Sequence, residues 1–370
     1  MPIEAVGIIG ATGGGVGIAE VLALRGFQVR LYDDFKDSLN IALAKINWSL
    51  SRSGKGEFLA NIEGVQDMIE LKGADIIIEA ASKEIDERKI LFEKLKNVMG
   101  SPYIIGARAG MPTLASLLEN TELPIDMTIG INFARPVKSN LLVELIRTDR
   151  TSDKAVNDCI DFIRKIGKTP VIIRDYPGAI FERLLRPFIL SAFRILEAGK
   201  GMPDEIDEAV KECGGIPTGP FEIADLIGLD ADYEATKAIY EALKSPERLT
   251  PSGVEQRLVQ YGQLGKKSTI GIYIYDDGRI VGINPTLSNV VKYLGLKKIT
   301  KTEIFGEIMR PVLEEAKCLA SEVMASEYDI ETVAKIGFGW PKGPFSYLRE
   351  KEESFRRKAP KTGFENLETF

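Results

Sequence analysis

A glycine-rich segment near the N-terminus has the residue types that bind a pyrophosphate. Residues 10–17 (GATGGGVG) follow an apolar run, Ala5–Ile9, and precede an apolar–polar pattern that predicts a helix closed by Gly26. Asp33 ends the next apolar run. Amides at a helix N-terminus bind phosphates, and a carboxylate at the end of the second strand binds a ribose hydroxyl. The segment therefore predicts a dinucleotide site, and Asp33 favours NAD over NADP.

One position of this segment departs from the usual G-x-G-x-x-G pattern. Its three glycine positions fall on Gly10, Thr12 and Gly15. The middle glycine lets the backbone approach the pyrophosphate, and the β-branched Thr12 adds bulk there. We therefore expect weak binding of NAD. A turn that keeps its shape without binding a cofactor is the alternative.

The composition excludes several kinds of chemistry. The chain has no histidine, which removes Ser-His-Asp and Cys-His machinery, histidine-ligated metals and a histidine base. Proton transfer is left to carboxylates, Lys, Tyr, Cys or water. The distant cysteines Cys159, Cys213 and Cys318 predict free thiols in a reducing compartment, with no disulfide and no metal cluster.

Length and charge limit the partners. The 370 residues suggest two to three domains, and 44% hydrophobic residues are enough to build their cores. A net charge of −6 argues against nucleic acid as a partner. No apolar run approaches the roughly 20 residues of a membrane helix, and the N-terminus lacks a basic region before its apolar stretch. We expect a cytoplasmic protein with neither a nucleic-acid nor a membrane partner.

The elements that position the glycine-rich segment form an α/β domain. Short apolar runs alternate with amphipathic stretches such as residues 84–99 and 152–166. This alternation predicts a doubly wound, mostly parallel, Rossmann-like sheet over residues 1–176. Its strands are predicted at residues 5–9, 27–34, 74–80, 103–107, 127–133, 143–147 and 170–174.

Helical periodicity dominates from residue 177 onward and predicts an all-helical part. Residues 186–221 match residues 310–345 without a gap, and both end in G-x-P-x-G-P-F. Such self-similarity predicts an internal repeat whose copies bury their apolar faces against each other. We expect a first copy at 177–278, a linker at 279–300, a shorter copy at 301–350 and a polar tail at 351–370.

Five segments together resemble the L-3-hydroxyacyl-CoA dehydrogenases, with Thr269 where that family has glycine. These segments are residues 7–34, 74–95, 167–188, 216–230 and 262–275. The chain is identified as a member of that family with two copies of its C-terminal helical domain and no enoyl-CoA hydratase part. The resemblance implies NAD-dependent oxidation of a 3-hydroxyacyl-CoA to a 3-ketoacyl-CoA in fatty acid metabolism.

Most of the family's catalytic positions are changed. The family uses a histidine as base and a glutamate that orients it; Asn132 stands at the first position and Glu144 at the second. Gly110 replaces a serine that contacts the substrate, and Glu182 replaces an asparagine. Asn132 has no basic lone pair, and a second carboxylate at Glu182 would oppose an enolate-like transition state.

The resemblance also places residues around the cofactor and the substrate. Lys83 falls on a cofactor-side glutamate, Arg88 on a lysine and Arg108 on an asparagine. We expect Arg108 to lie within salt-bridge reach of Glu182 or Glu144, in part of the substrate space. Residues 36–58 correspond to a shortened CoA-binding hairpin. There Ser49 falls on a CoA contact, and Lys55 could meet its phosphates.

Three functional hypotheses follow. The favoured one is a binder of NAD or acyl-CoA whose dehydrogenase site is retired, as a partner of a dehydrogenase or hydratase subunit. The second is an NAD-dependent oxidoreductase in which Glu182 or Glu144 acts as base on a 3-hydroxyacyl-CoA or a related hydroxy acid. The third is a structural remnant that binds no small molecule.

Overall fold

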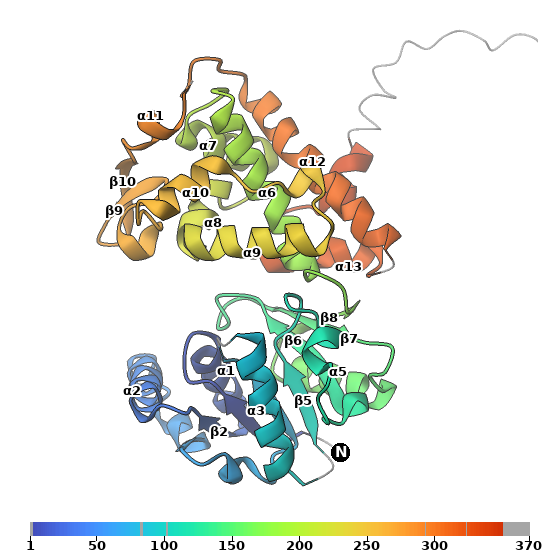
Figure 1. Ribbon diagram of the computed structural model, residues 1–370. Coiled ribbons are helices and arrows are strands. Elements are labelled where there is room, and N and C mark those ends of the chain that lie inside the picture. Colours follow the sequence, from blue (N-terminus) through green and yellow to red (C-terminus); the bar gives the residue numbers. More distant parts are fainter. Residues whose placement is uncertain (1–2, 82–83, 101–102, 293, 323, 351–370) are drawn as a thin grey trace, which may run out of the picture.

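An eight-stranded sheet with helices on both faces forms the N-terminal part of the chain, and a helical domain packs beyond one end of it (Figure 1). The computed structural model describes residues 3–350 except 82–83, 101–102, 293 and 323. The predicted polar tail at 351–370 lies outside the described residues.

The strand order is β3-β2-β1-β4-β5-β6-β7-β8, and all neighbours are parallel except β6 and β7. The prediction of a doubly wound, mostly parallel sheet is confirmed. Strand β3 was not predicted because its sequence, IEGV, lacks an apolar run, and its two central residues are exposed. The strands are β1 Ala5–Ile9, β2 Gln28–Tyr32, β3 Ile62–Val65, β4 Ile76–Glu79, β5 Ile104–Ala107, β6 Thr128–Phe133, β7 Leu142–Arg147 and β8 Thr169–Arg174.

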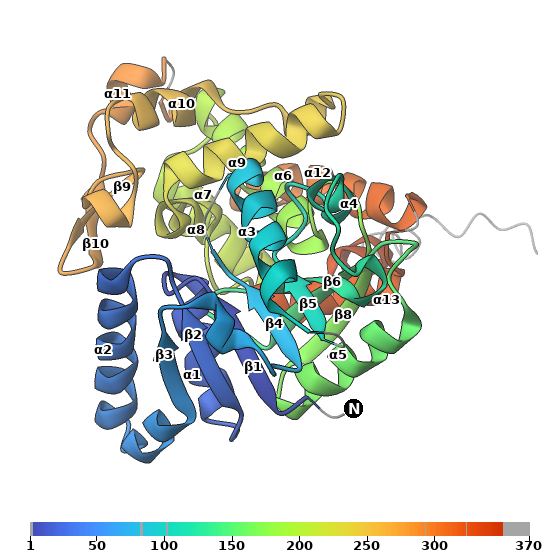
Figure 2. The ribbon, with the colours of Figure 1, turned by 60° about the horizontal axis from the view of Figure 1, so that its bottom comes forward.

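Alternating side chains of the strands cover two separate cores. In β4, Ile76 and Ile78 face the helices α1, α2 and α5, whereas Ile77 faces α3 and α4. Figure 2 shows the strands β3 to β5 side by side, with α2 at the β3 edge. These helices are α1 Gly14–Ala23, α2 Lys36–Arg52, α3 Ile85–Val98, α4 Leu114–Leu118 and α5 Asp153–Lys165.

The strand order reverses between β1 and β4, and this point fixes the place of the site. Strands β2 and β4 lie on opposite sides of β1, so the chain leaves β1 and β4 in opposite directions. Ligands of such sheets bind in the crevice at the carboxyl ends of these strands. The glycine-rich segment follows β1 directly and therefore lies at this crevice.

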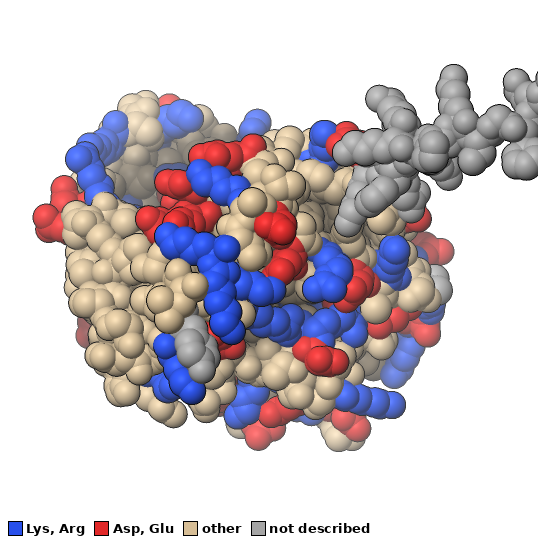
Figure 3. All heavy atoms as spheres, turned by 90° about the horizontal axis from the view of Figure 1, so that it is seen from above, with Lys and Arg blue, Asp and Glu red and all other residues tan. Residues whose placement is uncertain are grey.

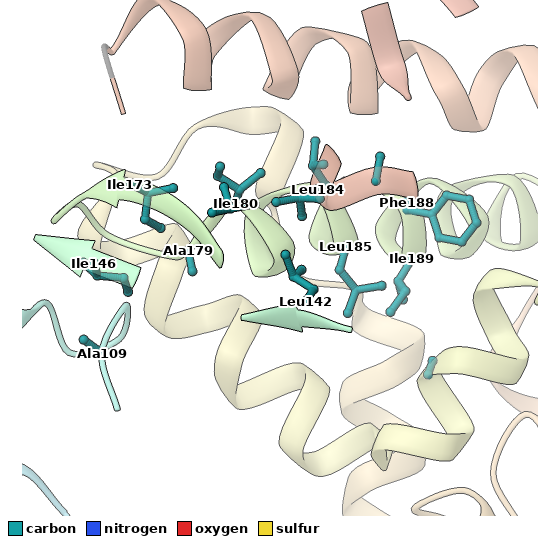
Figure 4. Close-up of a cluster of buried hydrophobic side chains, with 14 of the residues drawn as sticks. Ala109, Leu142, Ile146, Ile173, Ala179, Ile180, Leu184, Leu185, Phe188 and Ile189 are labelled. Carbon is teal, nitrogen blue, oxygen red and sulfur yellow. The ribbon is translucent and has the colours of Figure 1, made fainter. Parts of the chain in front are cut away.

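A continuous apolar cluster joins the sheet to the helical domain. Leu142 of β7 and Ile173 of β8 belong to the same cluster as Ile180, Leu184 and neighbouring side chains of α6 (Figure 4). Because α6 begins at Ile180, directly after β8 and a short loop, its first turns are buried against the sheet. The position of this helix relative to the crevice is therefore set by packing.

The remaining helices surround α6, and one short sheet interrupts them. Strands β9 (Tyr273–Asp276) and β10 (Arg279–Ile283) form an antiparallel pair that periodicity did not predict. Residues 279–300, expected as a linker, thus contain β10 and α11. The helices are α6 Ile180–Glu197, α7 Pro203–Gly214, α8 Pro220–Ile227, α9 Leu229–Ala242, α10 Gly253–Gln260, α11 Leu287–Val290, α12 Lys301–Ser321 and α13 Glu327–Thr332.

The outer face of the helical domain carries charges of both signs. Figure 3 shows Lys and Arg side chains lying among Asp and Glu side chains. Lys301 is paired with Glu208 and Glu212, and Lys298 with Glu205. Such mixing gives no broad positive field for a polyanion. Among the described residues, no helix is both long and apolar enough to cross a membrane.

Thr269 has a backbone conformation that suits glycine. Its φ is +62°, in the left-handed region, and its side chain is exposed. A residue other than glycine is destabilised by about 1–2 kcal/mol in this region, and glycine avoids that strain. Glycine also has more conformational freedom in the unfolded chain, which offsets part of the gain. Thr269→Gly should therefore raise the free energy of unfolding by about 0.5–1 kcal/mol in urea titrations.

Gly265→Ala is the opposite control. Gly265 has a φ of +94°, and an added methyl group would overlap the backbone of Asp225. This variant should be destabilised. A Thr269→Gly protein that is no more stable than wild type would show that the turn carries no strain.

Candidate functional site

The glycine-rich turn forms a cradle that side chains would fill. Gly10 has a φ of +106°, and a methyl group on it would lie 2.7 Å from the amide nitrogen of Ala81. A methyl group on Gly15 would overlap the carbonyl oxygen of Gly10. In the first turn of α1, the amide of Gly15 donates to the carbonyl of Thr12, and the amides that have no intrahelical acceptor are left for a ligand. The turn therefore fits a pyrophosphate group.

Thr12 and Asp33 flank the cradle. Thr12 is exposed, and its carbonyl accepts a hydrogen bond from the amide of Gly15 (3.1 Å). Asp33 Oδ2 accepts from the amide of Ala11 (2.8 Å), and Oδ1 accepts from the amide of Phe35 (3.0 Å). Asp33 thus holds the turn against the end of β2. Each carboxylate oxygen has a second lone pair left for a ribose hydroxyl.

Asn132 is bound to the backbone of Ala109 by two hydrogen bonds. Asn132 Oδ1 accepts from the Ala109 amide (3.1 Å), and Nδ2 donates to the Ala109 carbonyl (2.6 Å). Asn132 in β6 also lies directly opposite Glu144 in β7, so both side chains are on the same face of the sheet. Its amide is therefore engaged in fixing the loop after β5.

Gly110 connects that loop to the beginning of α6. Its carbonyl accepts a hydrogen bond from the amide of Gly178 (2.9 Å). Its φ is +119°, and an added Cβ would lie 3.2 Å from the amide nitrogen of Ala179. A serine at this position would be strained. The backbone of the loop therefore favours glycine at this position.

Glu144 lies in the interior at the start of α6. Its side chain is 3% exposed, and Oε1 accepts a hydrogen bond from the amide of Phe181 (3.0 Å). Burial raises the pKa of Glu144 to about 8; the amide of Phe181 opposes this shift, and the charge of Glu182 adds to it. Glu144 is therefore mostly protonated at neutral pH.

Glu182 lies beside Glu144 at the edge of a buried charged cluster. Glu182 is 44% exposed, and its Oε2 lies 3.1 Å from Nη2 of Arg186. Arg186 also pairs with Asp232 (2.6 Å). Burial, and then the charge of Asp232, raise the pKa of Glu255, which favours a protonated carboxyl next to Asp232.

Sequence reasoning did not assign a role to Arg186, Asp232 or Glu255. The spacing of Glu182 and Arg186, one helical turn apart, was the only local signal for this cluster. The pairing of Arg186 with Asp232 joins residues far apart in sequence, which no local pattern reveals. The cluster fixes one carboxylate oxygen of Glu182.

The expected ion pair of Arg108 needs correction. Arg108 forms no ion pair with Glu182 or Glu144; among the described residues, the partner of Glu182 is Arg186. Arg108 is exposed, and within the described ranges only its backbone forms hydrogen bonds. Arg88 is buried, where it pairs with Glu79 (2.5 Å) and donates to the carbonyl of Arg108. Lys83 lies outside the described residues.

The expected CoA contacts are arranged differently from a helical hairpin. The helix α2 is followed by a short 3-10 turn, Gly56–Asn61. Ser49 Oγ donates to Glu20 (2.8 Å) and accepts from Lys138 (2.7 Å), so Ser49 ties α2 to α1. Lys55 is exposed just after α2. Of the two residues, Lys55 is the one left open to solvent.

The turn after β1, at the switch point of the sheet and with Asp33 at the end of β2, defines a dinucleotide-binding domain of the dehydrogenase type. Residues 5–176 match the family model described as "3-hydroxyacyl-CoA dehydrogenase, NAD binding domain", and residues 178–275 match "3-hydroxyacyl-CoA dehydrogenase, C-terminal domain". The chain therefore belongs to the 3-hydroxyacyl-CoA dehydrogenase family.

Relatives and solved structures agree with this assignment. The chain is 33% identical to a 3-hydroxybutyryl-CoA dehydrogenase of Bradyrhizobium diazoefficiens, over 74% of this chain and 96% of that protein. It is 33% identical to the 3-hydroxyadipyl-CoA dehydrogenase of Escherichia coli, over 73% of this chain, and spans 59% of that protein. A crystal structure of 3-hydroxybutyryl-CoA dehydrogenase from Escherichia coli superposes with a TM-score of 0.84, at 26% identity, over 95% of this chain and 92% of that one.

The buried carboxyl of Glu144 makes stability depend on pH. In the unfolded chain its pKa is near 4.5, whereas in the folded protein it is about 8. The folded state therefore holds a proton that the unfolded state has lost, so this group's stabilisation falls as pH rises through that interval. Glu144→Gln keeps the acceptor for Phe181 and has no proton to lose. The difference in free energy of unfolding between Glu144→Gln and wild type should therefore shift in favour of the variant, by on the order of 3 kcal/mol, when the pH rises from about 5 to about 9.

Urea titrations of both proteins at the two pH values measure this gain. Glu119→Gln, at an exposed position, subtracts any general effect of removing a carboxylate. An equal pH dependence for Glu144→Gln and wild type would contradict the burial of a protonated Glu144.

Proposed function

We propose that this protein binds NAD and an acyl-CoA but does not oxidise 3-hydroxyacyl-CoA by the family's standard mechanism. The observation that carries this proposal is the pair of hydrogen bonds between Asn132 and the backbone of Ala109. The side chain at the base position cannot accept a proton, and it also serves the backbone. In this proposal the chain is the ligand-binding partner of an active dehydrogenase or hydratase subunit.

The residues of the cradle fit the cofactor. Gly10 and Gly15 leave room for the pyrophosphate, the first-turn amides of α1 would bind it, and Asp33 would bind a ribose hydroxyl. When bound, NAD supplies the acceptor for a hydride. The protein would hold the bound cofactor so that the nicotinamide is oriented relative to Glu144 and Glu182. A protonated Glu144 can donate a hydrogen bond but cannot act as a base near neutral pH.

A second function rests on the exposure of Glu182. Its side chain is 44% exposed and lies next to Glu144; Oε2 is buried against Arg186, so Oε1 is the oxygen that could accept a proton from a bound alcohol. This alternative makes the chain an oxidoreductase with Glu182 as base. The ion pair with Arg186 opposes it, because Oε2 of Glu182 lies 3.1 Å from the guanidinium and is directed at that partner.

We also propose that the helical domain arose by duplication, so that the second copy takes the place of a partner subunit. Contacts between matching segments support this proposal. A methyl group on Gly215 would lie 3.3 Å from Pro341, and one on Gly339 would lie 3.5 Å from Pro217. The four residues occupy corresponding positions in the matched segments, so the contact is reciprocal, as expected for an approximate two-fold axis.

Ligand-induced stabilisation tests binding. NADH and acetoacetyl-CoA should each raise the melting temperature, because a ligand that binds only the folded state stabilises it, by about 2.7 kcal/mol at a hundredfold excess over Kd. NADPH should raise it less, since Asp33 repels a 2′-phosphate. Thr12→Gly should tighten the binding of NADH. No shift with any of the three ligands would favour a structural remnant.

Restoring the base alone should not restore activity. Asn132→His should show no measurable oxidation of 3-hydroxybutyryl-CoA with NAD, because Gly110 and Glu182 remain at the substrate positions. It should also lose about 1–2 kcal/mol of stability, since both hydrogen bonds to Ala109 are removed. The double variant Asn132→His/Glu182→Asn, compared with Asn132→His alone, tests whether Glu182 also limits the oxidation. Robust turnover by Asn132→His alone would show that the rest of the site is intact.

A further inference from the structure

Arg135 lies against the glycine-rich turn. A methyl group built on Gly13 would lie 3.7 Å from Nη2 of Arg135, and one on Gly14 would lie 3.8 Å from the same atom. Gly13 is the N-cap of α1, and Gly14 is its first residue. The guanidinium is thus at the helix N-terminus, although it comes from the loop after β6.

The loop that carries Arg135 is fixed to α1. A methyl group on Gly17 would lie 3.0 Å from Cβ of Val137, so the loop packs closely on the helix. Lys138 forms an ion pair with Glu20 of α1 (2.5 Å). The ammonium of Lys168 donates to the carbonyl of Val137 (2.6 Å). Arg135 is therefore held at the turn by the packing of its neighbours.

The guanidinium of Arg135 has no hydrogen bond or ion pair within the described part of the chain. The residue is exposed. Desolvation by the surrounding atoms, and then the charges of Arg88 and Arg135, lower the pKa of Arg108, although its side chain still reaches solvent. The guanidinium of Arg108 likewise has no ion pair within the described residues. Two cations that repel each other at the mouth of the crevice would both be stabilised by an anion between or beside them.

We propose that Arg135 binds the pyrophosphate of the dinucleotide and compensates for Thr12, whose bulk holds the phosphates away from the backbone where the motif has glycine. A guanidinium donates two parallel hydrogen bonds to a phosphate, and the amides of α1 supply the rest of the cradle. The inference rests on the proposed binding of NAD. It adds a side chain to a site that the family motif builds from backbone alone.

Dissociation constants for NADH and ADP-ribose test this assignment. ADP-ribose keeps the pyrophosphate and lacks the nicotinamide. Arg135→Gln should raise the dissociation constants of both ligands by the same factor, at least about tenfold, because a charge-assisted hydrogen-bonded pair is lost. Arg135→Lys should lie between wild type and Arg135→Gln.

Arg150→Gln is the matched control. Arg150 is exposed and follows β7, which is antiparallel to β6, so it lies at the opposite edge of the sheet from the turn. Its substitution should leave both constants unchanged. The melting temperature of unliganded Arg135→Gln should equal that of wild type, because the guanidinium has no partner to lose among the described residues.

The outcomes separate this inference from the proposed function. Equal weakening of NADH and ADP-ribose by Arg135→Gln supports the inference. Wild-type affinity in Arg135→Gln, or weakening of NADH alone, overturns it while cofactor binding stands. Failure of the wild-type protein to bind either ligand removes the proposed cofactor binding and this inference with it.

Discussion

The contact between Glu144 and the first turn of α6 holds the sheet and the helical domain in one arrangement. The buried carboxyl accepts a hydrogen bond from the amide of Phe181. The apolar cluster of Figure 4 includes Leu142 and Ile146 of β7 and Ile180 of α6, the same two elements that this hydrogen bond joins. In the same turn, the buried Arg183 pairs with Glu315 of α12. The helix is therefore tied at its beginning both to the sheet and to the C-terminal helices. Separating α6 from α12 would leave the charges of Arg183 and Glu315 unpaired, and an unpaired buried charge is strongly destabilising.

The same junction also orders the residues of the candidate site. Asn132 binds the loop after β5, and Gly110 of that loop binds Gly178 just before α6. Asn132 and Gly110 thus each contribute a contact that orders the loop after β5. Arg186 in the same way holds one carboxylate oxygen of Glu182.

Local patterns and motifs predicted most of the fold and the positions of the central site residues. The apolar runs located seven of the eight strands because buried parallel strands have continuous apolar sequences. The resemblance placed Asn132, Glu144, Glu182 and Gly110, and the structure brings these four together. The partners of Arg88 and Arg186 could not be predicted, because each pairing depends on tertiary packing. The β9–β10 pair was missed because it is short and its second strand is largely exposed.

The most direct test of a retired site is a single-turnover measurement on the wild-type protein. NAD and 3-hydroxybutyryl-CoA are mixed with a stoichiometric amount of protein near neutral pH, under conditions where both are bound, and the absorbance of NADH is followed. The Asn132–Ala109 contact and the protonated Glu144 leave neither side chain able to accept the hydroxyl proton, so the account predicts no more NADH than in a mixture without protein. Formation of NADH together with acetoacetyl-CoA on the protein would contradict this account.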